Sequence, residues 1–179
     1  MNHRILISAV GRDEDAPATQ TTPVLASEMK IEERFIIPAP IDRVWAFVRN
    51  PDRVAPCIPG CERVEALSDT SYRSTIVVTL GPIKARFVVV VEITDEHPPT
   101  RLTCVTKGEE GSRASVINAN SELRLVELSA GETEVHCSSE VSIVGRLGKF
   151  GLGIMKKRAT QLAGEFAAAM RERVQAVDA

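Results

Sequence analysis

Residues 30–61 constrain the fold most, because prolines divide them into three short elements. An amphipathic run ends at Pro38-Ala39-Pro40, a second apolar segment follows, and a third begins at Asn50-Pro51 and stops at Pro59-Gly60. Proline is tolerated in the first turn of a helix, where its missing N–H has no partner, but it breaks a helix interior. The spacing therefore predicts a strand and two short helices within this stretch.

Alternation of apolar and polar residues dominates the chain after residue 61. In residues 83–94 every second side chain is apolar, and Gly81-Pro82 separates this run from a similar one before it. Its inward positions are Ile83, Ala85, Phe87, Val89, Val91 and Ile93. Successive side chains of a strand point to opposite faces, so such runs predict half-buried strands. Short connections between them favour antiparallel pairing.

The last part of the chain has a helical period instead. Apolar residues recur every three or four positions from residue 152 to 177, which predicts one amphipathic helix. They are Met155, Ala159, Leu162, Phe166, Met170, Val174 and Val177. The element order is β-α-α-β6-α. It predicts an α+β fold in which a curved antiparallel sheet wraps around a long C-terminal helix.

Composition divides the chain into two parts. Residues 1–28 show little periodicity and are rich in Asp, Glu, Ala, Thr and Pro from Gly11 onward. Such segments bury too little apolar surface to offset the entropy of ordering. We expect a flexible, disordered leader at 1–28 and a single domain at 29–179. An edge strand at His3 to Val10 is the alternative for the start.

Charge and hydropathy limit the classes of protein to which this chain can belong. The 22 Lys and Arg residues nearly balance 24 Asp and Glu, which argues against a nucleic-acid-binding protein. No run approaches the roughly 18 apolar residues of a membrane helix. We therefore expect a cytoplasmic protein whose four cysteines are reduced.

Three segments carry a family resemblance. They are Pro38-Ala39-Pro40 followed by Val44-Trp45, then Cys57-Ile58-Pro59-Gly60-Cys61, and Gly81-Pro82-Ile83-Lys84. With them the chain resembles the family of the carbon monoxide dehydrogenase G subunit, within the START-like helix-grip (SRPBCC) superfamily. The resemblance implies a non-catalytic accessory protein that places a molybdenum-containing dehydrogenase at the membrane. It also implies a hydrophobic ligand held between sheet and helix.

A cavity between sheet and helix is expected independently of the resemblance. Small inward residues on both walls cannot reach native packing density where a curved sheet stands away from the helix. An apolar void of this kind stays dry and binds apolar molecules. The cavity residues we predict are Ile76, Val78, Phe87, Val89, Cys104, Ala119, Cys137, Ser139, Val141, Ala159, Leu162 and Phe166.

The loop at 145–153 is the candidate gate. Four of its nine residues are glycine, and apolar side chains alternate with cations there and in the following turn. Apolar residues beside cations suit an anionic membrane surface. The gate and membrane-contact residues we predict are Leu147, Lys149, Phe150, Leu152, Lys156 and Lys157. The alternative is a lid whose Phe150 packs inward and whose basic run is merely solvated.

Other candidate sites are weak. Cys57 and Cys61 have zinc-like spacing but lack suitable further ligands, and neither His97 nor His136 has a nucleophile at motif spacing. Trp45 is either a ligand-stacking residue or, as we favour, an anchor for the first helix. We expect no catalytic residue, metal or cofactor.

The sequence thus favours a binding protein over an enzyme. We expect an apolar, lipid-like or quinone-like ligand and a role in recruiting a molybdenum hydroxylase, such as carbon monoxide dehydrogenase, to the membrane. The expected position is cytoplasmic, or peripheral at the inner membrane face. A helix-grip enzyme of the cyclase or dehydratase type is the first alternative, and a protein–protein adaptor with a filled core is the second.

Overall fold

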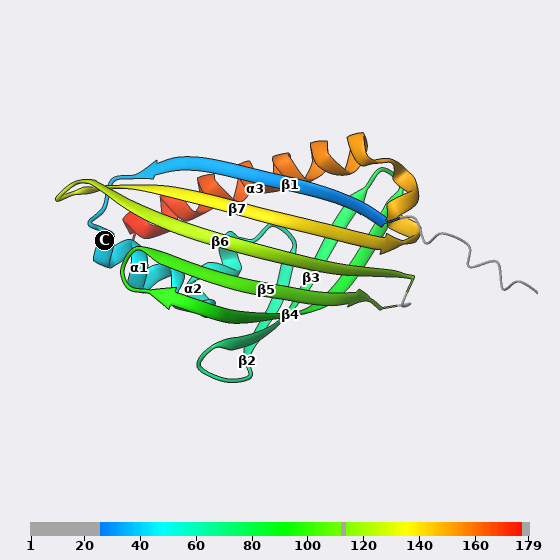
Figure 1. Ribbon diagram of the computed structural model, residues 1–179, viewed down its shortest axis with the longest axis horizontal. Helices are drawn as coiled ribbons and strands as arrows, with labels where there is room; N and C mark the ends of the chain where they lie inside the picture. The colour runs from blue at the N-terminus through cyan, green and yellow to red at the C-terminus, as the bar shows by residue number, and fades with distance from the viewer. Residues whose placement is uncertain (1–25, 112–113, 177–179) are drawn as a thin grey trace, which may run out of the picture.

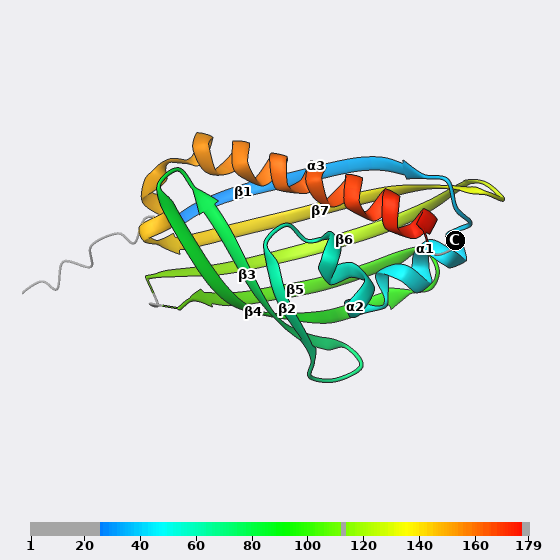
Figure 2. The ribbon, with the colours of Figure 1, turned by 180° about the vertical axis from the view of Figure 1, so that it is seen from behind.

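The computed structural model of the protein describes residues 26–111 and 114–176. Seven antiparallel strands form one sheet in the order β1-β7-β6-β5-β4-β3-β2, and α3 lies across its concave face (Figures 1 and 2). The strands are β1 (Ala26–Ile37), β2 (Cys61–Ala66), β3 (Ser71–Leu80), β4 (Ile83–His97), β5 (Arg101–Glu110), β6 (Ser115–Ser129) and β7 (Glu132–Gly145). The helices are α1 (Ile41–Val48), α2 (Pro51–Val54), η1 (Ala55–Cys57), η2 (Arg146–Phe150) and α3 (Leu152–Ala176). The predicted α+β architecture and element order are confirmed.

The prolines and glycines act locally as their chemistry requires. Pro51 occupies the first turn of α2, and the Asn50 side chain caps that helix by accepting hydrogen bonds from the next backbone N–H groups. Gly60 ends the helical segment at a φ of 78°. A Cβ on Gly60 would lie 2.1 Å from the Val77 carbonyl oxygen, so only glycine lets β2 start against β3.

The first strand begins earlier than the sequence indicates. Ala26 pairs with Val144 of β7, and the buried Ser27 pairs with Ile143. Residues 26–28 therefore belong to the sheet rather than to a leader, which corrects the predicted boundary at residue 29. Alternation alone missed them because Ala26 and Ser27 are small and carry no apolar signal. The rest of the leader, including the possible strand at His3 to Val10, lies outside the described residues.

The packed core occupies one end of the fold. There the C-terminal half of α3 meets α1 and the ends of β1 and β7, and Ile37, Val44, Val135, Met170 and Val174 are fully buried. Arg171 fixes the helix to β1: its Nε donates to the Ile36 carbonyl oxygen at 2.9 Å, and its guanidinium lies 5.9 Å from the centroid of the Phe35 ring. Burial of this apolar cluster, more than helix propensity, holds α3 in place.

Candidate functional site

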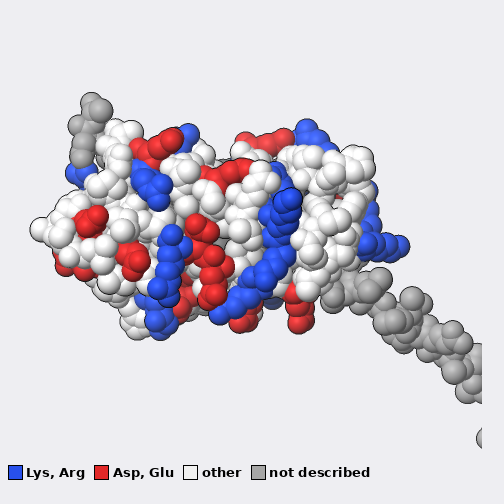
Figure 3. Space-filling model, turned by 90° about the horizontal axis from the view of Figure 1, so that it is seen from above, with Lys and Arg blue, Asp and Glu red and all other residues white. Residues whose placement is uncertain are grey.

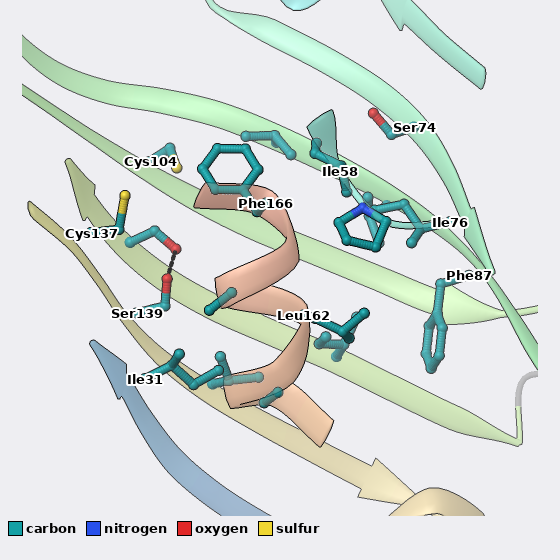
Figure 4. Close-up of a pocket in the computed structure, with 18 of the residues that line it drawn as sticks. Ile31, Ile58, Ser74, Ile76, Phe87, Cys104, Cys137, Ser139, Leu162 and Phe166 are labelled. Carbon is teal, nitrogen blue, oxygen red and sulfur yellow. Dashed lines mark hydrogen bonds between the residues drawn. The ribbon is translucent and has the colours of Figure 1, made fainter. Parts of the chain in front are cut away.

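A cavity of about 540 Å³ lies between the concave face of the sheet and the N-terminal half of α3. Figure 4 shows side chains from the sheet and from α3 converging on this space. Residues of α2, η1 and the turn before β2 form a further wall, and Val54, Ile58 and Pro59 line the cavity there. The cavity therefore begins where the packed core ends.

The strand registers place the wall residues in rows across the sheet. In the central row Cys104 of β5 pairs with Ser121 of β6, Ser121 pairs with Ser139 of β7, and Ser139 pairs with Ile31 of β1. The row nearer the core runs through Leu102, Leu123, Cys137 and Glu33. Most other wall positions are aliphatic or aromatic, so the site suits an apolar molecule.

Nearly all of the predicted cavity residues come together here. Ile76, Val78, Phe87, Val89, Cys104, Cys137, Ser139, Val141, Ala159, Leu162 and Phe166 line the cavity. Ala119 lies on the same face of β6, between Ile117 and Ser121, but is not among the lining residues. Its side chain is a single methyl group between two longer neighbours, which accounts for the difference. Trp45 packs against the core cluster and does not line the cavity.

Several lining residues were not among the predicted site residues, although Ser74, Ser121 and Ala163 do have the inward positions and small side chains on which the cavity was predicted. The alternation of side chains along β1 could have identified its three lining residues. In contrast, α2 and the turn after η1 have no periodic pattern that would reveal theirs. The missed residues are Met29, Ile31, Glu33, Val48, Pro51, Val54, Ala55, Ile58, Pro59, Val64, Tyr72, Ser74, Leu80, Val91, Ile93, Leu102, Ile117, Ser121, Glu122, Leu123, Ile143, Met155, Arg158 and Ala163. Leu147, predicted as a gate residue, also lines the cavity.

Polar groups are few in this wall. The Ser121 and Ser139 hydroxyl oxygens lie 2.7 Å apart and form a hydrogen bond (Figure 4). Burial raises the pKa of the Cys104 thiol, and burial together with the nearby Glu33 carboxylate raises the pKa of Cys137 to about 12. Both thiols therefore stay protonated and unreactive at neutral pH. The Glu33 carboxylate forms no hydrogen bond or ion pair with another described residue.

The segment η2 closes one end of the cavity and is held by buried polar contacts. Leu147 is only 1 % exposed, and its backbone N–H donates to the Ser115 hydroxyl at 3.2 Å. The Ser27 hydroxyl donates to the Gly148 carbonyl oxygen at 3.3 Å. Arg146 forms an ion pair with the buried Glu110. The start of the predicted gate is thus fixed to β1, β5 and β6.

The remaining gate residues divide by exposure. Phe150 is half-buried and packs against apolar clusters at this end of the cavity. Leu152 is 49 % exposed and Ile154 is 57 % exposed. Lys149, Lys156 and Lys157 are exposed and form no ion pair with another residue in the described ranges. The structure therefore places exposed apolar and cationic side chains together where η2 meets α3.

The Glu110–Arg146 pair predicts a pH dependence of stability. Its hydrogen bond to Arg146 holds the pKa of the Glu110 carboxyl below its ordinary value. A group whose pKa is lowered on folding stabilises the protein above its unfolded pKa, roughly 4.3, and this stabilisation is lost as the pH falls through the folded value. Below about pH 4.3 the wild type should lose stability more steeply than Glu110→Gln. Urea unfolding at several pH values measures this. The control is Glu127→Gln, at an exposed position, which should behave like the wild type. If the free energy of unfolding falls equally steeply with pH in the wild type and in Glu110→Gln, the prediction is wrong.

Two further classes of site receive no support from the described residues. No group of three or more His, Cys, Asp or Glu side chains is placed to hold a metal ion in residues 26–111 and 114–176. Within the same ranges, no helix combines the length and apolar character needed to cross a membrane. Acidic and basic side chains intermingle on the face seen in Figure 3 and do not gather into one patch.

Similar folds occur among solved structures. A conserved protein from Geobacillus kaustophilus matches with a TM-score of 0.76 at 18% identity, covering 83% of this chain and 96% of that one. A START superfamily protein from Mycobacterium smegmatis matches with a TM-score of 0.64 at 13% identity, covering 83% and 98%. The Zhui aromatase/cyclase from Streptomyces sp. R1128 matches with a TM-score of 0.64 at 14% identity, covering 85% and 96%. These likenesses establish the START-like helix-grip fold.

The family follows from the sequence. No curated protein matches the chain. The family model of the carbon monoxide dehydrogenase G subunit (CoxG) matches residues 34–175, which include strands β2 to β7, η2 and nearly all of α3. The protein is therefore a member of the carbon monoxide dehydrogenase CoxG family with a START-like helix-grip fold.

Proposed function

We propose that this protein binds an apolar, lipid-like or quinone-like molecule between its sheet and α3, without transforming it. In this role it is an accessory protein that brings a molybdenum hydroxylase, such as carbon monoxide dehydrogenase, to the inner face of the membrane. The cavity of about 540 Å³ is the observation that carries the proposal. Family membership supports the choice of partner enzyme.

The wall chemistry supports binding rather than an empty core. Leaving a space of this size unfilled forfeits the dispersion contacts of its lining, so an apolar occupant stabilises the fold. A ligand bound only by the native state adds to stability in proportion to the logarithm of its concentration. Water is a poor occupant, because most of the lining offers it no hydrogen-bond partner.

Extraction of the purified protein tests this role directly. Organic solvent extraction followed by mass spectrometry should recover an apolar molecule in near-stoichiometric amount. Native mass spectrometry of the same sample should show the matching mass increase. Protein purified without any such molecule, and unable to bind an apolar fluorescent dye, would instead favour the adaptor with a filled core.

An enzyme of the same fold is the second candidate, and Glu33 is the observation that favours it. Its carboxylate lines the cavity and has no hydrogen-bond or ion-pair partner among the described residues, so it is available to accept a proton from a bound molecule. The two functions differ in the fate of the bound molecule. Under the binding role, its mass stays unchanged after prolonged incubation with the wild-type protein. Loss of water or ring closure that Glu33→Gln abolishes would establish the enzyme.

The junction of η2 and α3 is the surface we propose for membrane contact. Leu152 and Ile154 can enter the lipid interface there, while Lys149, Lys156 and Lys157 attract anionic headgroups. Each such cation near an anionic surface contributes about 1 kcal/mol. Opening beside the membrane would let an apolar ligand pass without crossing water.

Charge reversal at this junction should weaken membrane association. Lys156→Glu with Lys157→Glu should lower binding to vesicles containing anionic lipid by about tenfold or more at low salt, because attraction becomes repulsion. Vesicle sedimentation measures the effect. The matched control is Arg34→Glu with Lys107→Glu, two exposed cations elsewhere on the sheet with the same net charge change. If both double variants bind like the wild type, the lysines are only a solvated face.

A further inference from the structure

Three of the polar groups that line the cavity are adjacent across the sheet. Cys104, Ser121 and Ser139, here called the polar row, are direct neighbours across β5, β6 and β7 and line the cavity together. Figure 4 shows Cys104 beside Phe166 and Ser139 farther along the wall, between Cys137 and Ile31. Phe87 and Leu147 belong to an apolar cluster that lines the cavity with Ile76, Ile117 and Ile143. The cavity therefore has a hydrogen-bonding region and an apolar region.

The polar row can form more hydrogen bonds than it forms within the protein. Each serine hydroxyl carries one proton and two acceptor lone pairs. One proton is used in the 2.7 Å bond between Ser121 and Ser139. The other hydroxyl proton and several lone pairs remain for the neighbouring Cys104 thiol or for an occupant of the cavity. A hydrogen-bonding group of a ligand can satisfy them where an apolar group cannot.

The charges around the polar row decide what kind of head group fits. Glu33 lies one row away, beside Cys137, and its negative charge disfavours an anion there. The lining cation, Arg158, is eight residues from Phe166 on α3, a distance of roughly 12 Å along the helix axis. Its ion-pair partner is Glu165, at 3.6 Å. Among the described residues that line the cavity, Arg158 is the one cation, and Glu165 already neutralises it.

We infer that the ligand carries an uncharged carbonyl or hydroxyl oxygen that hydrogen-bonds to Ser121 and Ser139, while its apolar body extends toward Phe87 and Leu147. This inference rests on the proposed binding function and adds the chemical class and orientation of the ligand. Fatty acids and other amphiphiles with an anionic head at the polar row are excluded by it. An uncharged hydrocarbon also binds, but more weakly, because it cannot form the hydrogen bond.

Three probes of one shape and different polarity test the inference. Acetylnaphthalene carries a neutral carbonyl, isopropylnaphthalene is its apolar counterpart, and naphthoate is an anion. Each is titrated against the apolar dye phenylnaphthylamine bound to the full-length protein. The ketone should displace the dye at about three- to tenfold lower concentration than the hydrocarbon, the factor corresponding to one net hydrogen bond. Naphthoate should be the weakest.

Serine variants assign the preference to the polar row. Ser121→Ala with Ser139→Ala, and each change alone, should bring the ratio of ketone affinity to hydrocarbon affinity toward one. Ser74→Ala is the matched control, because Ser74 lines the same cavity from β3, and it should keep the wild-type ratio. Melting temperatures verify that each variant is folded.

The possible failures are distinguishable. If ketone and hydrocarbon displace the dye equally from the wild type, the inference is wrong but binding in the cavity is not. The same holds if the double serine variant still prefers the ketone. Tightest binding of naphthoate overturns it in favour of an acidic head, and loss of that preference in Arg158→Gln would place the head at the cation on α3. If neither the dye nor any probe binds, the proposed function itself fails.

Discussion

Ala163→Phe is expected to reduce the affinity for an apolar probe by more than about tenfold while the protein stays folded. Ala163 lies on the face of α3 that lines the cavity. A larger side chain in a close-packed core costs about 1–3 kcal/mol, but here the added ring enters open space. Ring and ligand would then compete for the same volume, so binding suffers and stability does not.

Dye titration and thermal unfolding measure the two effects separately. Ala168→Phe is the matched control, since Ala168 lies on the same helix but is exposed. It should leave probe affinity unchanged. A wild-type affinity in Ala163→Phe would show that the probe binds elsewhere and would remove the cavity from the proposed function.

Met170→Ala should destabilise the protein by about 2–5 kcal/mol, the usual range for truncating a buried methionine. Met170 is fully buried in the core cluster, where α3 packs against Phe35, Ile37 and Val135. Leu162→Ala, two turns earlier on the same helix, should cost only about 1 kcal/mol. Leu162 already borders open space and loses fewer contacts.

Urea unfolding measures the loss of unfolding free energy for both variants. The comparison tests whether the two halves of α3 have different roles. The C-terminal half holds the helix on the sheet, and the N-terminal half forms a wall of the cavity. Equal losses in the two variants would mean that the cavity is collapsed in solution. A bound ligand would raise the cost of Leu162→Ala, so the measurement is made on extracted protein.

This separation of core and cavity explains how one fold can be stable and partly hollow. The core cluster gathers Phe35, Phe47, Met170 and other apolar side chains at one end. Toward the other end the wall includes small residues such as Ser139 and Ala159, which leave space between sheet and helix. The ion pair of Glu110 with Arg146 and the burial of Leu147 together hold η2 over that end.

Much of the architecture was predictable from local sequence patterns. The prolines in residues 38–59 defined the entry into two short helices, because proline acts on the backbone of its own segment. Alternation defined the long strands, and the stripe from Met155 to Val174 defined α3. Each signal depends on neighbours a few positions apart, so no tertiary information was needed. The same alternation identified cavity residues on β3, β4, β5 and β7, since the cavity occupies the inward face of the sheet.

Arg146 shows where the sequence was insufficient. In the sequence it belongs to a basic run that indicates a membrane-facing loop, but its guanidinium pairs with Glu110, 36 positions earlier. Arg158 likewise turns to Glu165. The three remaining lysines are the ones we propose for membrane contact. Which cations stay available depends on which acidic groups the fold brings to them.

The sequence by itself determined the elements, the faces they bury and the family to which the chain belongs, because propensity and periodicity are local. Only the tertiary structure decided the chemistry of the cavity. Ser121 and Ser139 are 18 positions apart and meet through the register of β6 on β7, and Glu33 enters the wall through the pairing of β1 with β7. A shift of one residue would turn these side chains to the opposite face. Register is set by the whole sheet, so alternation can place a side chain on the inward face but cannot show which side chains meet there.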